Sequence, residues 1–161
     1  MAGFTLIELI IVIAIIAILA GAIFVAIDPA RRLHESRNAR RSNDISTILE
    51  ALKTYQADHE GDLLASVSSM TAGNYYQIGV DNSGCNRTCA GPTTQSACVD
   101  LSGIGSDYLA KVPFDPKEGS EENTGYAITK DSNGTLTLLA CDGEGEGSGG
   151  NGNIPDLRVS R

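Results

Sequence analysis

A single carboxylate lies inside the most apolar part of the chain. Between Phe4 and Ile27 the only polar side chains are Thr5 and Glu8. An ionised carboxylate in lipid or in a protein interior is unstable unless a cation or several hydrogen-bond donors accompany it. Glu8 is therefore the first candidate functional residue, predicted to meet a cationic group. The alternative is a residue at a membrane interface that has no partner.

The apolar run, residues 4–27, has the length of a membrane-spanning helix. Its 24 residues make a helix of about 36 Å, which exceeds the roughly 30 Å of a bilayer's hydrocarbon core. A helix also satisfies all of its backbone groups internally, as a segment in lipid must. A cleaved secretory signal has a shorter apolar part, so we expect this run to remain in the mature protein.

The residues around Glu8 form a motif. The stretch Gly3-Phe4-Thr5-Leu6-Ile7-Glu8-Leu9-Ile10 places a glycine, a phenylalanine, a small polar residue and a glutamate at the start of the apolar helix. This stretch resembles the N-terminus of type IV pilins and pseudopilins. The resemblance implies cleavage by a dedicated peptidase between Gly3 and Phe4, followed by N-methylation of Phe4. It also implies that Glu8 pairs with the N-terminal amine of a neighbouring subunit.

Charge pairing gives this implied role a physical basis. Cleavage leaves a cationic amine on Phe4, and a buried amine and a buried carboxylate are each unfavourable alone. Together they form a charge-assisted hydrogen bond, which couples subunit register to the removal of unpaired charge. The leader, residues 1–3, lacks the Lys or Arg that leaders of the family usually carry. The positive-inside rule alone would place residues 31–41 in the cytoplasm, whereas the resemblance implies that they lie outside.

Residues 28–60 are predicted to continue the helix after a break. Asp28-Pro29 favours a kink, with Asp28 as the helix cap and Pro29 at the first helical position. Gly21 is a second predicted weak point, because family filaments often unwind between such positions. The apolar stripe of the following helix is expected to lie against a globular head. The stripe comprises Ile45, Ile48, Leu49, Leu52 and Tyr55.

The charge distribution argues against nucleic acid as a partner. The net charge is −8, and residues 61–161 hold six basic groups against thirteen acidic ones. The five arginines between 31 and 41 are the only basic cluster, and a solvated helix face explains them better than a DNA site. We expect them to project from the head, where acidic surfaces of neighbouring subunits can meet them.

The head, residues 61–141, holds all four cysteines. These are Cys85, Cys89, Cys98 and Cys141. An even number in an exported domain predicts two disulfides, and the sequence does not choose among the three pairings. The alternative, a zinc site, finds no support because the spacing matches no zinc ligand set.

A hairpin is the clearest element of the head. Residues 125–130 and 135–141 read as strands, and Asn133-Gly134 supplies their turn. The pairs Tyr108-Leu109, Val112-Pro113 and Asp115-Pro116, with Gly125-Tyr126, resemble the heads of pilins and major pseudopilins. The fold class is therefore predicted as α+β: a pilin fold with a long N-terminal helix and a small antiparallel sheet.

The last segment, residues 142–161, is predicted to be a flexible acidic tail. Asp142, Glu144 and Glu146 alternate with glycines, and oxygen ligands in tight turns suit calcium. Major pseudopilins are similar in having a calcium site near this end. A solvated tail that binds no cofactor is the favoured alternative.

Catalytic signatures are absent from the sequence. It contains no nucleophile elbow, phosphate loop, HExxH motif or dinucleotide fingerprint, and His34 and His59 are expected to be solvated. We therefore expect a structural protein rather than an enzyme. The resemblance implies a single-pass precursor in the cytoplasmic membrane, processed by prepilin peptidase and assembled by pilus machinery into a homopolymeric extracellular filament.

The role of such a filament stays open among several alternatives. Adhesion, twitching motility and DNA uptake are roles that the sequence does not separate. A major pseudopilin of a type II secretion system is the first alternative to a pilin. A membrane-anchored binding domain that never polymerises is the second.

Overall fold

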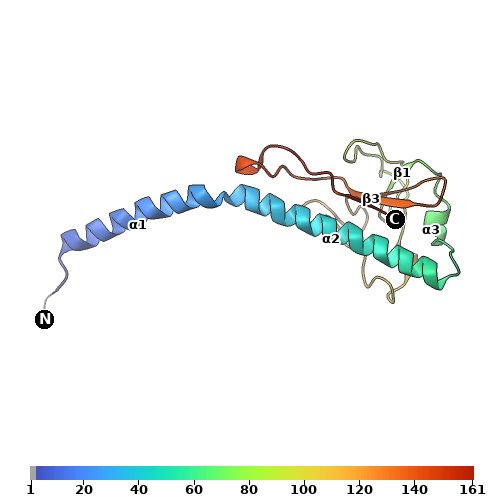
Figure 1. Cartoon of the computed structure of the whole chain (residues 1–161), viewed down its shortest axis with the longest axis horizontal. Helices are drawn as coiled ribbons and strands as arrows, with labels where there is room; N and C mark the ends of the chain where they lie inside the picture. Colours follow the sequence, from blue (N-terminus) through green and yellow to red (C-terminus); the bar gives the residue numbers. More distant parts are fainter. Residues whose placement is uncertain (1–2) are drawn as a thin grey trace.

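Two helices in line form a long rod, and the head packs around the second of them (Figure 1). This computed structural model describes residues 3–161. The rod consists of α1 (Leu6–Ile27) and α2 (Pro29–Asp58). The head adds α3 (Ala65–Ser68), the 3-10 turns η1 (Ser102–Ile104) and η2 (Ser148–Gly150), and the strands β1 (Tyr75–Gln77), β2 (Tyr126–Lys130), β3 (Leu136–Ala140) and β4 (Arg158–Ser160).

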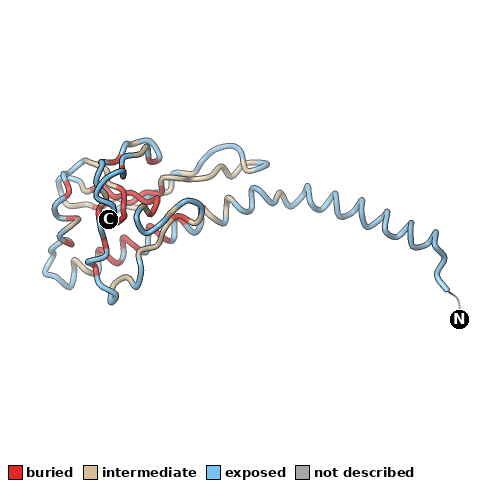
Figure 2. The backbone as a smooth tube through the Cα atoms, turned by 180° about the vertical axis from the view of Figure 1, so that it is seen from behind, coloured by how far each residue is buried: buried red, intermediate tan, exposed pale blue. Residues whose placement is uncertain are grey.

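The helix α1 stands free of the head. None of its residues is buried, and Figure 2 shows the exposed class along its whole length. A helix that is apolar on every side needs lipid or other protein around it. Among the described residues, α1 provides the one apolar stretch long enough to cross a membrane.

The two helices meet at Asp28, where the backbone adopts the left-handed conformation (φ 47°, ψ 73°). The Asp28 carboxylate accepts a hydrogen bond from the backbone N–H of Arg31 at 3.3 Å, and Pro29 opens α2. The predicted break at Pro29 is therefore present. In contrast, α1 continues through Gly21 without a break. A lone glycine disfavours a helix by only about 1 kcal/mol, which the hydrogen bonds of the surrounding helix offset.

The sheet is antiparallel, with the strands in the order β1-β2-β3-β4. Its centre is the predicted hairpin, in which Tyr126 pairs with Ala140 and Lys130 with Leu136. Asp131 closes the turn, because its Oδ1 accepts hydrogen bonds from the backbone N–H groups of Asn133 and Thr135, both at 2.8 Å.

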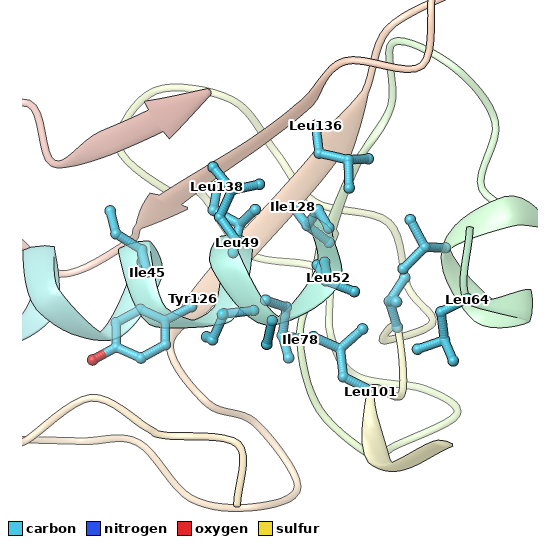
Figure 3. Packing of buried hydrophobic residues seen from close by; sticks show 14 of the residues in the cluster. Ile45, Leu49, Leu52, Leu64, Ile78, Leu101, Tyr126, Ile128, Leu136 and Leu138 are labelled. Atoms are coloured by element: carbon cyan, nitrogen blue, oxygen red, sulfur yellow. The ribbon is translucent and has the colours of Figure 1, made fainter. Parts of the chain in front are cut away.

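The core lies between α2 and the sheet (Figure 3). One face of α2 contributes the predicted stripe, of which Ile45, Ile48, Leu49 and Leu52 are buried. Ile128, Leu136 and Leu138 cover them from the hairpin. Each buried side chain of this size contributes about 1.5–3 kcal/mol relative to exposure. The prediction of an α+β, pilin-like architecture is confirmed.

The predicted solvated tail is wrong for this structure. Residues 142–157, here called the C-terminal arm, run back along α2 toward α1 and then return to the sheet (Figure 1). The chain then forms β4, which pairs with β3 through Leu138 and Val159. Composition suggested flexibility, but hydrogen bonds to α2 hold the arm in place, as described below.

Both pairs of cysteines form disulfides in the structure. Cys85 bonds to Cys98 within one loop, and Cys89 bonds to Cys141 at the end of β3. The second bond joins the loop to the sheet, beside the small buried cluster of Ala127 and Leu139.

Candidate functional site: the apolar helix and its junction with the head

The Glu8 carboxylate lies at the start of α1 and is hydrogen-bonded to Thr5. The Glu8 carboxylate oxygen Oε2 accepts hydrogen bonds from the Thr5 backbone N–H at 2.8 Å and from the Thr5 hydroxyl at 2.7 Å. In return the Thr5 hydroxyl accepts from the Glu8 backbone N–H at 3.3 Å. This reciprocal capping box starts the helix and fixes the carboxylate at its end. Among the described residues, no hydrogen bond reaches the second carboxylate oxygen.

Phe4 and Gly3 lie in the segment that precedes α1. Phe4 is 93% exposed, so neither helix nor head covers the peptide bond that the sequence predicts to be cut. Residues 1–2 of the predicted leader lie outside the described residues. Cleavage here would put the new amine one residue before the Thr5–Glu8 cap.

The flank of α1 is apolar throughout. Its exposed large side chains are Leu6, Ile7, Leu9, Ile10, Ile11, Val12, Ile13, Ile15, Ile16, Ile18, Leu19, Ile23, Phe24, Val25 and Ile27. Such a surface is larger than soluble monomers leave in water. Lipid can cover it, and so can helices of the same kind, and the exchange of one for the other keeps the apolar surface buried.

A cluster of charges joins α2 to the head. Arg41 is fully buried; its Nε and Nη2 donate to the two carboxylate oxygens of Asp115 at 2.5 and 3.2 Å. Its Nη1 donates to Glu144 and to the Asn38 side-chain oxygen, both at 2.9 Å. Arg37 reaches the same Glu144 carboxylate at 3.0 Å. Two of the arginines expected to project toward neighbours are therefore bound within their own chain.

Arg41 sets the ionisation of its two partners. Burial opposes ionisation of Asp115, but hydrogen bonds from Arg41 and from the Lys117 backbone outweigh it and lower the pKa of Asp115. Burial also opposes ionisation of Glu144, whose pKa is lowered by Arg41 and Arg37. Both groups are therefore carboxylates at neutral pH, and the cluster is an ion network.

The C-terminal arm extends this network toward α1. The Asn38 amide donates to the Glu144 carbonyl at 2.7 Å and to the Glu146 carboxylate at 2.9 Å. His34 lies 3.0 Å from the Gly145 carbonyl through Nδ1, so it is partly covered rather than solvated as predicted. At the tip of the arm, the Gly149 N–H donates to the Asp28 carboxylate at 2.7 Å.

The three predicted calcium ligands face different partners. Asp142 binds Arg87 at 2.6 Å, Glu144 binds Arg41, and Glu146 binds Asn38. Over residues 3–161, no group of three or more metal-ligating His, Cys, Asp or Glu side chains comes together. The calcium site stays a prediction without a gathered ligand set.

The contacts of some site residues were not predicted from the sequence. Thr5 was seen only as part of the motif, although a threonine three residues before a glutamate is the signature of a capping box. Asn38 carried no signal, and Asp115 stood out only as part of the Asp115-Pro116 pair. Their contacts to the arm and to α2 join segments far apart in the sequence.

Comparison with known proteins bears on the N-terminal segment. No curated protein and no solved structure matches the chain. Residues 1–24 match the family model described as the prokaryotic N-terminal methylation motif. The motif implies processing by a prepilin peptidase and delivery to an assembly machinery. The match confirms the resemblance seen in Gly3–Ile10: the chain carries the N-terminal methylation motif, consistent with type IV pilins and pseudopilins.

Proposed function

We propose that the chain is a pilin that polymerises through α1 into a type IV pilus-like surface filament. The observation that carries the proposal is Glu8, held by Thr5 at the start of an entirely exposed apolar helix. A helix that only anchors a protein has no use for a carboxylate at that depth. A helix that must meet the amine of another subunit does.

The proposed mechanism has three steps. Cleavage after Gly3 frees the amine of Phe4, which is then methylated. The Glu8 carboxylate of one subunit accepts a charge-assisted hydrogen bond from the amine of its neighbour. The helices then leave the lipid and pack against one another, with no cofactor required.

The proposal also places the protein in the cell. Residues 4–27 span the cytoplasmic membrane before assembly, and the head lies outside, where its two disulfides persist. The assembled filament is extracellular and serves adhesion, motility or DNA uptake.

A major pseudopilin of a type II secretion system is the second candidate. The Asp115-Pro116 pair favours it, because the pair resembles the heads of major pseudopilins. In this structure Asp115 anchors its loop to α2 through Arg41. Fibres on intact cells that express the protein at its natural level support the pilin. Their absence, with loss of secreted enzymes on deletion, supports the pseudopilin.

The testing experiment compares sheared surface material from wild type, Glu8→Ala and Glu8→Gln cells by electron microscopy and N-terminal mass spectrometry. We expect wild-type fibres that begin at methylated Phe4. Both variants should yield at least ten-fold fewer fibres, because they leave a buried amine without its carboxylate. Glu50→Ala is the control, since Glu50 is an exposed glutamate on α2.

The contrary result is equally specific. If wild-type cells yield no fibres and the protein retains Met1 in the membrane, the proposal fails. The chain is then a membrane-anchored binding domain, and Glu8 has no role in assembly.

A further inference from the structure

The direction in which α1 leaves the head depends on one residue. No residue of α1 is buried, so the sheet and loops do not hold it. The link to α2 passes through Asp28, whose φ of 47° lies in a region that non-glycine residues seldom occupy. A non-glycine residue keeps such a conformation only where surrounding contacts hold it.

The tip of the C-terminal arm fixes this junction. Each carboxylate oxygen of Asp28 has its own donor: Oδ1 accepts from the Arg31 N–H at 3.3 Å, and Oδ2 accepts from the Gly149 N–H at 2.7 Å. The first bond caps α2 locally. The second spans 121 residues of sequence, so it ties the junction to the head.

The base and the tip of the arm are held with different strength. The base is anchored by Glu144, whose carboxylate binds Arg41 and Arg37. The Glu144 carbonyl accepts a hydrogen bond from the Asn38 amide, and the Glu144 backbone N–H donates one to the Asn38 side-chain oxygen. The tip, residues 147–152, consists largely of glycines. Its hydrogen bond to the junction is the one from Gly149 to Asp28, and Gly150 lies beside the His34 ring. Glycines regain much conformational freedom on release, so the tip opens more readily than the base.

We propose that the C-terminal arm is a strap whose tip, closed on Asp28, locks the direction of α1, and whose release lets α1 re-orient. The lock is a property of the single chain. The use of its release, as a subunit passes from the membrane into a filament, rests on the proposed function.

The first test measures hydrogen exchange by mass spectrometry on the full chain in detergent micelles. Asp28→Asn keeps one carbonyl oxygen and remains a good helix cap, but it cannot serve both donors as the carboxylate does. We expect exchange to accelerate about five-fold, as for one lost hydrogen bond, in peptides covering 147–152 and 24–31. The hairpin, 126–140, should not change.

Two further variants make the result decisive. Asp28→Ser keeps a hydroxyl that can cap the Arg31 N–H but lacks the second oxygen that accepts from the Gly149 N–H, and it should accelerate exchange in the same two peptides. Asp156→Asn is the matched control, because Asp156 is an exposed carboxylate bound to Arg158. If either Asp28 variant accelerates exchange in 147–152 but leaves exchange in 24–31 unchanged, the strap does not lock the junction and the proposal is overturned.

A comparison of micelles with assembled fibres tests the release. We expect residues 147–152 of the wild type to exchange faster in fibres. If fibres form and the tip stays protected, release during assembly is overturned while the pilin function stands. If no fibres form, the proposed function fails. The measurements in micelles still test whether the strap holds the junction between α1 and α2.

Discussion

Arg41 is the residue on which the head depends most. It is buried without exposed surface and meets two carboxylates, Asp115 and Glu144, that come from separate segments. Each nitrogen of the Arg41 guanidinium has an acceptor, and the Asn38 side chain joins the guanidinium to the Glu144 backbone. Networks of this kind stabilise only while they stay complete.

Arg41→Met is expected to lower the free energy of unfolding by about 3–5 kcal/mol, because it leaves the buried Asp115 without its cation and Glu144 with Arg37 as its only arginine. Denaturant titration of the full chain in detergent provides the measurement. Arg40→Met is the control, because Arg40 is exposed and forms only a loose ion pair with Asp44, at 3.7 Å. This variant should lower the free energy of unfolding by less than about 1 kcal/mol. Equal losses for the two variants would refute the special role of Arg41.

The same network predicts the response to acid. Asp115 and Glu144 have folded pKa values below the usual 3.8 and 4.5. Their stabilisation is therefore complete above those usual values and is lost as the pH falls through the lower folded values. The unfolding free energy should decline below about pH 4.5, and the double variant Asp115→Asn, Glu144→Gln should flatten that decline. If the unfolding free energy of the double variant declines below about pH 4.5 as steeply as that of the wild type, these two groups do not cause the decline.

At this scale, the sequence predicts what is local. Glu8 stands out because its neighbours are apolar, and its cap lies three residues away. Arg41 did not stand out, because Asp115 lies 74 residues away and Glu144 lies 103 residues away. Only the folded chain brings them together.

The two disulfides differ in range: one closes a short loop, and the other connects that loop to the sheet. Cys85–Cys98 spans 13 residues, whereas Cys89–Cys141 spans 52 and connects the loop to β3. The loop that each bond closes sets how strongly it restricts the unfolded chain. The two bonds therefore contribute unequally.

Replacement of each cysteine pair by alanine tests this difference. Loop-closure entropy gives about 4 kcal/mol for the pair at 89 and 141 and about 3 kcal/mol for the pair at 85 and 98. Denaturant titration of the two double variants should rank them in that order. The reverse order would mean that local packing around Cys85 outweighs chain entropy.

Elements with a clear period or turn were predictable, whereas β4 was not. The stripe on α2 and the Asn133-Gly134 turn give α2, β2 and β3 directly. In contrast, β4 is three residues long and exposed on alternate positions, and a glycine-rich segment precedes it. Its strand conformation comes from pairing with β3, which no local pattern encodes.

The whole molecule separates into a packed head and a free apolar helix. Every residue of the two core clusters lies between positions 45 and 159, and α1 contributes none. The head therefore has what it needs to fold without α1. The apolar surface of α1 is what requires lipid or other subunits.

A fragment comprising residues 28–161 is thus expected to be a folded monomer in water. Its melting temperature should lie within about 4 °C of that of the head in the full chain, a shift that corresponds to roughly 1 kcal/mol. Calorimetry and sedimentation provide the measurements. An aggregated or unfolded fragment would show that α1 supports the head, contrary to its exposure.

The position of Arg41 has a mechanical consequence. If the chain assembles as proposed, tension on the filament reaches each head through α1 and pulls α2 along its own axis. At Arg41, α2 is bound to the Asp115 loop and to Glu144 of the arm at once. Pulling lengthwise loads these ion pairs together, in shear, instead of peeling them apart one after another. The buried arginine thereby transmits the load from α2 to the rest of the head.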